Sequence, residues 1–274
     1  MRQFDRTDGA QSAFESDSGK ETPHTMASMQ ALAARLVEAR RTHTLIDTLA
    51  DDLLPASPAD AYLAQQLTIA ALGGGAGYKI GAKTPTDEPQ CAPLPASRVF
   101  GAKTGVRRAD YSRIGLELEI AFSFATDIDN TFAERTDDVL DAIDAMSVVV
   151  EVVDSRFKAW PQVDKLAQLA DLQNNGALVI GETKRYDRRF DFVAPKVSFH
   201  CGDQEIFSGQ ASNPAGDPRR LVVWLVTRTL QSGQTIPART LLTTGSYTGI
   251  YMAEGPDIVR GTIEGIGSIE FEIA

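Results

Sequence analysis

Two strongly apolar segments of this chain carry three glutamates. Residues 116–124 read LELEIAFSF, and residues 148–153 read VVVEVV. Because side chains alternate along a β-strand, Glu117 and Glu119 project from one face, about 7 Å apart, and the large apolar residues take the other face. Glu151 is the one charge in a run that is otherwise valine on both faces. Such segments are typical of strands in a well-covered β-sheet, where a carboxylate needs a specific partner.

The three carboxylates admit a metal-binding and a purely structural interpretation. A buried carboxylate is too costly unless it is paired or bound to a metal. Three hard oxygen donors on two strands suit a divalent ion such as Mg²⁺ or Mn²⁺. The structural alternative places Glu117 and Glu119 on a solvated sheet face, and Glu151 at an edge or in an ion pair. The pattern alone leaves both interpretations open.

The composition of the chain narrows its range of partners. Its 274 residues are 43% hydrophobic, enough for one large domain or for one domain with a helical appendage. The formal net charge of −10 argues against nucleic acid and anionic membranes as partners. Cys91 and Cys201 lack zinc-ligand spacing, and no apolar run has the length of a membrane span. Because residues 1–21 show no signal peptide, we expect a cytoplasmic protein.

The order of elements predicts an α+β fold with an amino-terminal helical part. Residues 1–28 are polar and are predicted to form a disordered tail. Residues 29–76 contain two amphipathic helical segments, and residues 77–274 form a β-rich catalytic domain. Because strands outnumber helices in the second half without regular βαβ alternation, a mixed sheet is favoured over a doubly wound one.

Helix signals mark several segments along the chain. The spacing of apolar residues predicts helices over 29–42 and 161–173, and an apolar stripe from Val139 to Met146 predicts a helix that begins at residue 136. Ser57-Pro58 and Asp217-Pro218 are typical helix starts, with proline at the first helical position.

Two further segments are candidates for chemistry. Gly77-Tyr-Lys-Ile-Gly81 places Lys79 in a short apolar strand, where the side chain either extends to water at a sheet edge or faces a carboxylate-rich site. Thr244-Gly245-Ser246 follows an apolar strand and offers backbone N–H groups and a hydroxyl. Gly245 and Ser246 are therefore candidates for binding a substrate carboxylate, and the alternative is a plain turn.

Together these motifs resemble a known family. In sequence order they are GYKIG at 77–81, ELEIAF at 117–122, EVVDSR at 151–156, TGS at 244–246 and GIGS at 265–268. Over residues 29–273 the chain is similar to the 2-keto-4-pentenoate hydratase and 4-oxalocrotonate decarboxylase group of the fumarylacetoacetate hydrolase superfamily. The most specific part of the resemblance is E-x-E followed at this separation by E-x-x-D-S-R.

The resemblance implies a site, a fold and a mode of assembly. It implies that Glu117, Glu119 and Glu151 hold one divalent cation, usually Mg²⁺ or Mn²⁺. It implies that Lys79 contacts the substrate or assists proton transfer. It also implies a mixed β-sheet roll and a homo-oligomer.

Four functions follow as expectations, of which three are catalytic and act on a small 2-oxo acid. The leading one is a metal-dependent hydratase that adds water to a 2-hydroxy-2,4-dienoate and yields a 4-hydroxy-2-oxo acid. The first alternative is decarboxylation of a 4-oxalocrotonate-type diacid, which needs no attacking water. The second is hydrolysis of an acylpyruvate, which needs a general base, for which His43 is the amino-terminal candidate besides His24 in the tail. The third is a catalytically silent partner subunit.

Overall fold

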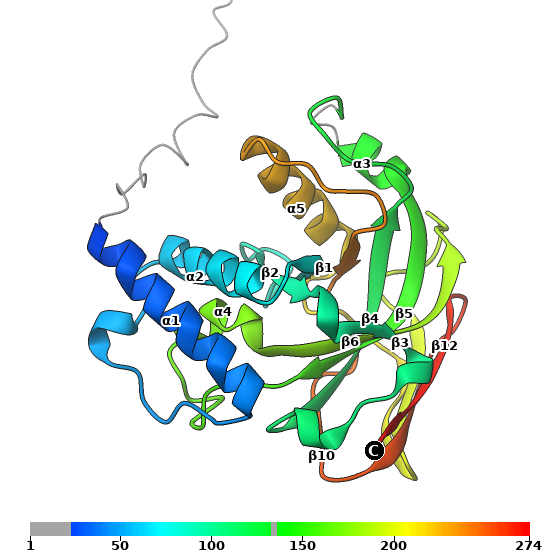
Figure 1. Cartoon of the computed structure of the whole chain (residues 1–274). Helices are drawn as coiled ribbons and strands as arrows, with labels where there is room; N and C mark the ends of the chain where they lie inside the picture. The colour runs from blue at the N-terminus through cyan, green and yellow to red at the C-terminus, as the bar shows by residue number, and fades with distance from the viewer. Residues whose placement is uncertain (1–22, 133–135) are drawn as a thin grey trace, which may run out of the picture.

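The computed structural model describes residues 23–132 and 136–274. Most of the predicted tail, residues 1–22, lies outside the described residues, and helix α1, Pro23–Thr42, begins ahead of the expected start at residue 29. Figure 1 shows α1, α2 and α4 as a helical layer beside a curled β-sheet. Within the described ranges, no helix is long and apolar enough to cross a membrane.

The larger sheet contains the segments that carry the glutamates. Among the described residues, eight strands form it in the order β2-β1-β9-β4-β5-β6-β3, with β10 paired to β4. The bounds are β1 Gly75–Gly81, β2 Gln90–Pro95, β3 Val99–Gly101, β4 Ile114–Phe124, β5 Ile143–Val153, β6 Asn175–Arg185, β9 Leu241–Thr243 and β10 Tyr251–Ala253. The sheet is mixed, as expected, because β1–β9 and β3–β6 pair in parallel and the other pairs are antiparallel.

A second sheet packs against the first. It has the order β12-β11-β7-β8, with β7 Lys196–Cys201, β8 Gln204–Gln210, β11 Asp257–Ile263 and β12 Gly267–Ile273. The main hydrophobic core joins the two sheets and includes Leu118, Val150, Phe199, Val259 and Phe271, all buried. The predicted α+β class with a curled mixed sheet is confirmed.

Capping residues set the starts of two helices. Helix α2, Pro58–Ala71, begins after Ser57, whose hydroxyl accepts a hydrogen bond from the Asp60 N–H at 3.2 Å. Helix α5, Arg219–Gln231, begins directly after Pro218 and packs on the main core. Both starts are as predicted, although Pro218 occupies the capping position itself.

Two predicted helices are shorter than their apolar stripes. Helix α3, Thr136–Ala142, ends before Ile143, and the rest of its predicted stripe lies on β5 because the ladder between β4 and β5 extends to that point. Helix α4, Lys165–Ala170, covers only the middle of the predicted 161–173 helix. The carboxylate of Asp164 caps the start of this helix by accepting hydrogen bonds from the backbone N–H groups of Leu166 and Ala167.

A second core joins α1 and α2 to α4. Its buried members include Leu32, Leu36, Ala61, Phe157 and Leu169. This core fixes the position of α4 and so of the chain that leads from α4 into β6, which enters the site described next.

Candidate active site

The three glutamates converge on one face of the larger sheet. In the antiparallel ladder of β4 and β5, Glu117 lies directly opposite Glu151, and Glu119 is two positions further along β4. One carboxylate oxygen from each residue lies within 4.8 Å of the others. Glu119 and Glu151 have 1% and 0% of their surfaces exposed, so these two are not part of a solvated face.

The triad has the chemistry of a divalent-cation site. Glu151 Oε2 is buried and has no hydrogen-bond partner among the described residues. Glu119 Oε2 accepts hydrogen bonds from Thr243 Oγ1 and, at 2.9 Å, from the Gly245 N–H, which hold its carboxylate in place. A buried oxygen without a partner, next to two further carboxylates, fits Mg²⁺ or Mn²⁺, which prefer hard oxygen ligands.

Burial and mutual repulsion raise the pKa of two of these carboxyl groups above the usual value for glutamate. Burial, and then the charge of Glu151, raises the pKa of Glu117 to about 7. Burial, and then the charges of Glu151 and Glu117, raises the pKa of Glu119 to about 8. A bound cation favours the ionised forms, so cations and protons compete for the triad.

We expect the affinity for Mn²⁺ to rise steeply with pH. With pKa values of about 7 and about 8, Glu117 and Glu119 must lose protons before they bind a cation at lower pH. From pH 8 to pH 6 the affinity should fall by about 10- to 50-fold if one proton is displaced and by roughly several hundred-fold if both are. Calorimetric titrations in buffers of different ionisation enthalpy count the released protons. An affinity that stays constant over this interval contradicts the expectation.

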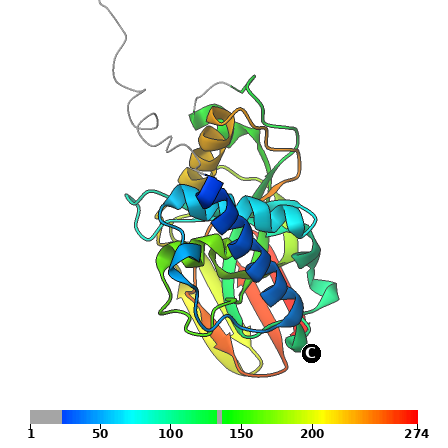
Figure 2. The ribbon, with the colours of Figure 1, turned by 60° about the vertical axis from the view of Figure 1, so that its left-hand side comes forward.

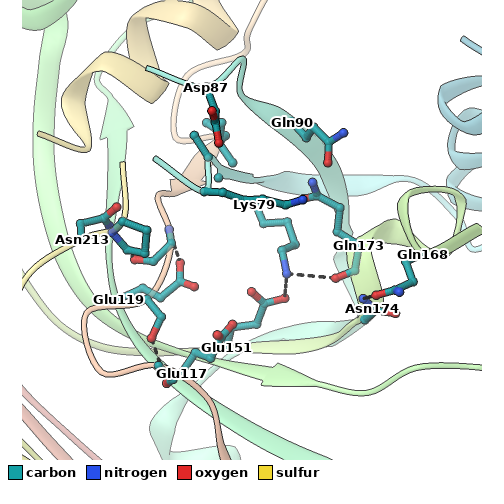
Figure 3. A pocket seen from close by; sticks show the side chains of 18 of the residues that line it. Lys79, Asp87, Gln90, Glu117, Glu119, Glu151, Gln168, Gln173, Asn174 and Asn213 are labelled. Carbon is teal, nitrogen blue, oxygen red and sulfur yellow. Dashed lines mark hydrogen bonds and ion pairs between the residues drawn. The ribbon is translucent and has the colours of Figure 1, made fainter. Parts of the chain in front are cut away.

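Lys79 adds a cation to the cluster from strand β1. A Cβ atom on Gly77 would lie 2.2 Å from the backbone oxygen of Leu241, so this glycine allows β1 to pair closely with β9. Figure 3 shows the Lys79 side chain directed at the triad, with Nζ 2.7 Å from Glu151 Oε1 and 3.2 Å from the Gln173 carbonyl oxygen. Burial alone lowers the pKa of Lys79, but the carboxylates, Glu151 foremost, outweigh burial and leave the pKa raised. Lys79 therefore faces the carboxylates as an ammonium and does not extend to water at a sheet edge.

Gly245 and Ser246 line the same pocket as the glutamates and Lys79. The Gly245 N–H is donated to Glu119, and its φ of +86° is a left-handed conformation that glycine adopts without strain. The Ser246 hydroxyl donates to the Gly249 carbonyl oxygen at 3.0 Å. Both donors are thus engaged within the protein, and their role in substrate binding stays a prediction.

A cavity of about 750 Å³ opens in front of the triad. Its walls carry the amide side chains of Gln90, Gln168, Gln173, Asn174 and Asn213, which Figure 3 labels. Lys83, Lys165, Asp87 and Glu88 line it as exposed residues and form its rim. The pocket therefore has one cation beside the triad and two more at its rim.

Sequence reasoning missed the buried amides that orient this site. Asn175 Nδ2 donates to Glu151 Oε1 at 2.8 Å. Asn213 Nδ2 donates to the Gly245 carbonyl oxygen at 2.9 Å. The partners are 24 and 32 residues apart in the sequence, so only the fold reveals these contacts.

The chain between α4 and β6 enters the pocket in an uncommon conformation. Leu172, Gln173 and Asn174 have positive φ angles of 51°, 52° and 60°. A non-glycine residue in this left-handed region costs about 1–3 kcal/mol, and such residues concentrate at functional sites. This left-handed turn presents the Gln173 carbonyl oxygen to Lys79 and replaces the end of the predicted 161–173 helix.

The fold and the site together can be compared with those of known proteins. A curled mixed sheet with three convergent glutamates and a facing lysine is the arrangement that the sequence resemblance implied for the fumarylacetoacetate hydrolase superfamily. No family model matches the chain. By sequence it is 25% identical over 132 residues to 4-oxalocrotonate decarboxylase of Pseudomonas putida, a match that covers 48% of this chain and 50% of that protein.

Solved structures extend the similarity to nearly the whole chain. 4-Oxalocrotonate decarboxylase from Pseudomonas putida G7, complexed with magnesium and adipate, superposes with a TM-score of 0.78 at 21% identity and covers 90% of this chain and 98% of its own. 2-Hydroxyhepta-2,4-diene-1,7-dioate isomerase from Mycobacterium marinum gives a TM-score of 0.56 at 17% identity and covers 73% of this chain and 75% of its own. The chain therefore has the fold of this group, and the resemblance predicted from its motifs is confirmed.

Proposed function

We propose that this protein is a divalent-metal-dependent lyase that decarboxylates a small 2-oxo diacid of the 4-oxalocrotonate type. The observation that carries the proposal is the convergence of Glu117, Glu119 and Glu151 in one pocket with Lys79. The similarity to 4-oxalocrotonate decarboxylase over half of that protein's length and the shared fold support it. Mg²⁺ or Mn²⁺ suits the donor set, and the solved relative was complexed with magnesium.

The charges of the site suit an anionic substrate. The three glutamates would hold the cation, and together with one divalent ion they would carry a single negative charge. Lys79 would cancel that charge before the substrate arrives. When bound, the divalent cation supplies a Lewis acid and a template for the 2-oxo acid.

Decarboxylation needs a destination for an electron pair and a source of a proton. When the bond to the distal carboxylate breaks, CO₂ leaves, and the electron pair spreads through the conjugated chain to the 2-oxygen. The Lys79 ammonium stabilises the negative charge at that oxygen and delivers a proton to it, which yields a 2-hydroxy-dienoate. Glu151, 2.7 Å from Nζ, orients the ammonium for this step.

Decarboxylation ranks ahead of hydration, the first expectation from the sequence, because of the pocket rim. Lys83 and Lys165 are exposed there and form no ion pair with the described residues. A second carboxylate, which only the diacid possesses, meets a cationic partner at this rim. Hydration remains the second candidate because Asp87 and Glu88 also line the pocket and can direct a water molecule.

The remaining alternatives have less support. His43, the residue considered for hydrolysis, lines a separate cavity, and none of the described residues that line the active pocket is a histidine. The complete cluster of three glutamates and Lys79 argues against a silent subunit. Assembly into a homo-oligomer is still an expectation, which light scattering of the purified protein tests.

An assay with two substrates tests the proposed function. Purified protein loaded with Mg²⁺ is offered 4-oxalocrotonate and, separately, 2-hydroxypenta-2,4-dienoate, with CO₂ release and product formation as readouts. We expect metal-dependent CO₂ release from the diacid that stops on chelation. Turnover of the dienoate alone would favour hydration, and turnover of neither substrate would contradict the proposed function.

The rim lysines give a test of the preference for a diacid. Replacing both Lys83 and Lys165 with alanine should raise KM for the diacid by about three- to tenfold, the effect of losing one or two exposed charge contacts, and leave KM for the dienoate unchanged. Lys196→Ala is the control, because this lysine is exposed on β7 and pairs with Glu264 at 3.0 Å. Equal changes in KM for both substrates would show that the rim lysines do not bind the distal carboxylate.

A further inference from the structure

The left-handed turn Leu172–Asn174 and the residue after it contact both members of the Lys79–Glu151 pair. The Gln173 carbonyl oxygen accepts a hydrogen bond from Lys79 Nζ at 3.2 Å. Asn175 Nδ2 donates to Glu151 Oε1 at 2.8 Å, the same oxygen that Lys79 contacts at 2.7 Å. The position of this short segment therefore sets the orientation of the ammonium and of one carboxylate of the triad.

Two arginines, Arg156 buried and Arg40 largely buried, hold this segment at both of its ends. Arg156 Nε lies 2.7 Å from Asp171 Oδ1, and its guanidinium also donates to the Asn175 carbonyl oxygen at 3.1 Å. Arg40 makes the same bridge, with 3.2 Å to Asp171 Oδ1 and 2.9 Å to the Asn175 carbonyl oxygen. Asp171 precedes the turn and Asn175 follows it, so each guanidinium spans the turn.

Arg40 reaches this position from outside the pocket. It belongs to α1, which Figure 2 shows lying across the outer side of the molecule. Arg40 lines a separate cavity of about 350 Å³, which does not include Lys79. An effect of Arg40 on chemistry therefore passes through the segment from Asp171 to Asn175, which it contacts.

Stability alone explains this buried cluster poorly. Arg40 Nε is buried without a hydrogen-bond partner among the described residues, so the guanidinium is not fully satisfied. Buried ion pairs often stabilise a fold no better than apolar residues of similar size, and geometric specificity is a better-attested use for them. A turn of three left-handed non-glycine residues persists only when its surroundings hold it.

We propose that Arg40 is a positioning residue that fixes the Leu172–Asn174 turn and thereby orients Lys79 and Glu151. Helix α1 then contributes to the geometry of the active site as well as to the stability of the fold. The consequence for catalysis rests on the proposed function, whereas the consequence for cation binding at Glu151 does not.

The test compares the same substitution at two neighbouring arginines of α1. Arg40→Met removes the bridge, and we expect kcat to fall about tenfold and the Kd for Mn²⁺ to rise about three- to tenfold, near the lower end of effects seen when outer partners of a metal site are lost. KM should stay within about twofold. Arg41→Met is the control, because among the described residues Arg41 pairs only with the exposed Glu38 of the same helix, and it should change none of these values.

Thermal unfolding, measured on each variant, separates positioning from a merely structural role. A lower Tm for Arg40→Met with kcat and Mn²⁺ affinity unchanged at 25 °C overturns the proposal. If Arg40→Met does not fold, Arg40→Lys retains the charge beside Asp171 but cannot make the full bridge. It should lose part of kcat and of Mn²⁺ affinity, and wild-type values for both overturn the proposal. If neither substrate is turned over, the Mn²⁺ titration decides alone.

Discussion

Replacing Glu119 with glutamine is expected to lower metal-dependent turnover by about 10³-fold, to the level of the chelated protein. Glutamine has nearly the same size and can still accept a hydrogen bond from the Gly245 N–H, so packing around the buried side chain is preserved. It removes one of the three negative charges that the cation requires. Initial rates with Mg²⁺ or Mn²⁺, together with a direct Mn²⁺ titration, measure the loss.

Glu270→Gln is the matched control for this substitution. Glu270 also belongs to an E-x-E strand, but it is exposed on β12 and pairs with Arg260 at 2.7 Å. Its replacement should leave turnover within about twofold, as for other exposed ion pairs. Full activity of Glu119→Gln, or of wild-type protein after exhaustive chelation, would refute a catalytic metal at the triad.

The metal-free protein provides an independent readout of the same carboxyl. Burial, and then the charges of Glu151 and Glu117, raises the pKa of Glu119 from the usual 4.5 to about 8, so the folded state binds a proton that the unfolded state has released. Metal-free wild-type protein should therefore lose stability as pH rises between these two values. Glutamine cannot ionise, so Tm of Glu119→Gln should fall less over this interval, which also verifies that the variant folds.

The two strands that contain E-x-E show what strand alternation can and cannot predict. Alternation along a strand correctly placed Glu117 and Glu119 on one face, and it places Glu270 and Glu272 on one face equally well. The first pair faces a pocket and the second faces solvent. Two features distinguished the first pair before the fold was known. One is the valine-rich segment with Glu151, where a charge needs a partner, and the other is the family resemblance of E-x-E followed by E-x-x-D-S-R.

The supporting contacts could not be predicted because they depend on tertiary packing. Asn174 tolerates a left-handed conformation, but Leu172 and Gln173 do not favour one, so the composition does not predict three left-handed residues in succession. Likewise, the spacing of Asp154 and Arg156 in the sequence favours a local ion pair. In the structure Arg156 contacts Asp154 at 3.5 Å but Asp171 at 2.7 Å. Local patterns thus predicted the charged groups, and long-range packing decides what holds them.

Replacing Lys79 with methionine is expected to reduce kcat by about 10²-fold or more, the usual contribution of a positioned acid–base group. Methionine keeps most of the packing volume but removes the ammonium that faces Glu151 at 2.7 Å. Without it, the 2-oxygen of the substrate loses both its proton donor and the positive charge next to it. Rapid-quench measurement of a single turnover reports the chemical step directly.

The same variant should affect cation binding in two opposing ways. It removes a positive charge that repels a cation at Glu151, which strengthens binding. The charge of Lys79 lowers the pKa of both Glu117 and Glu119, so its loss favours their protonated forms and makes protons stronger competitors for the triad. Saturating Mn²⁺ at pH 9 should therefore restore occupancy but not kcat. Lys184→Ala serves as the control, because this lysine is exposed and donates a hydrogen bond to the Gly265 carbonyl oxygen, away from the triad. A variant with raised KM and unchanged kcat would show that Lys79 binds the substrate without taking part in proton transfer.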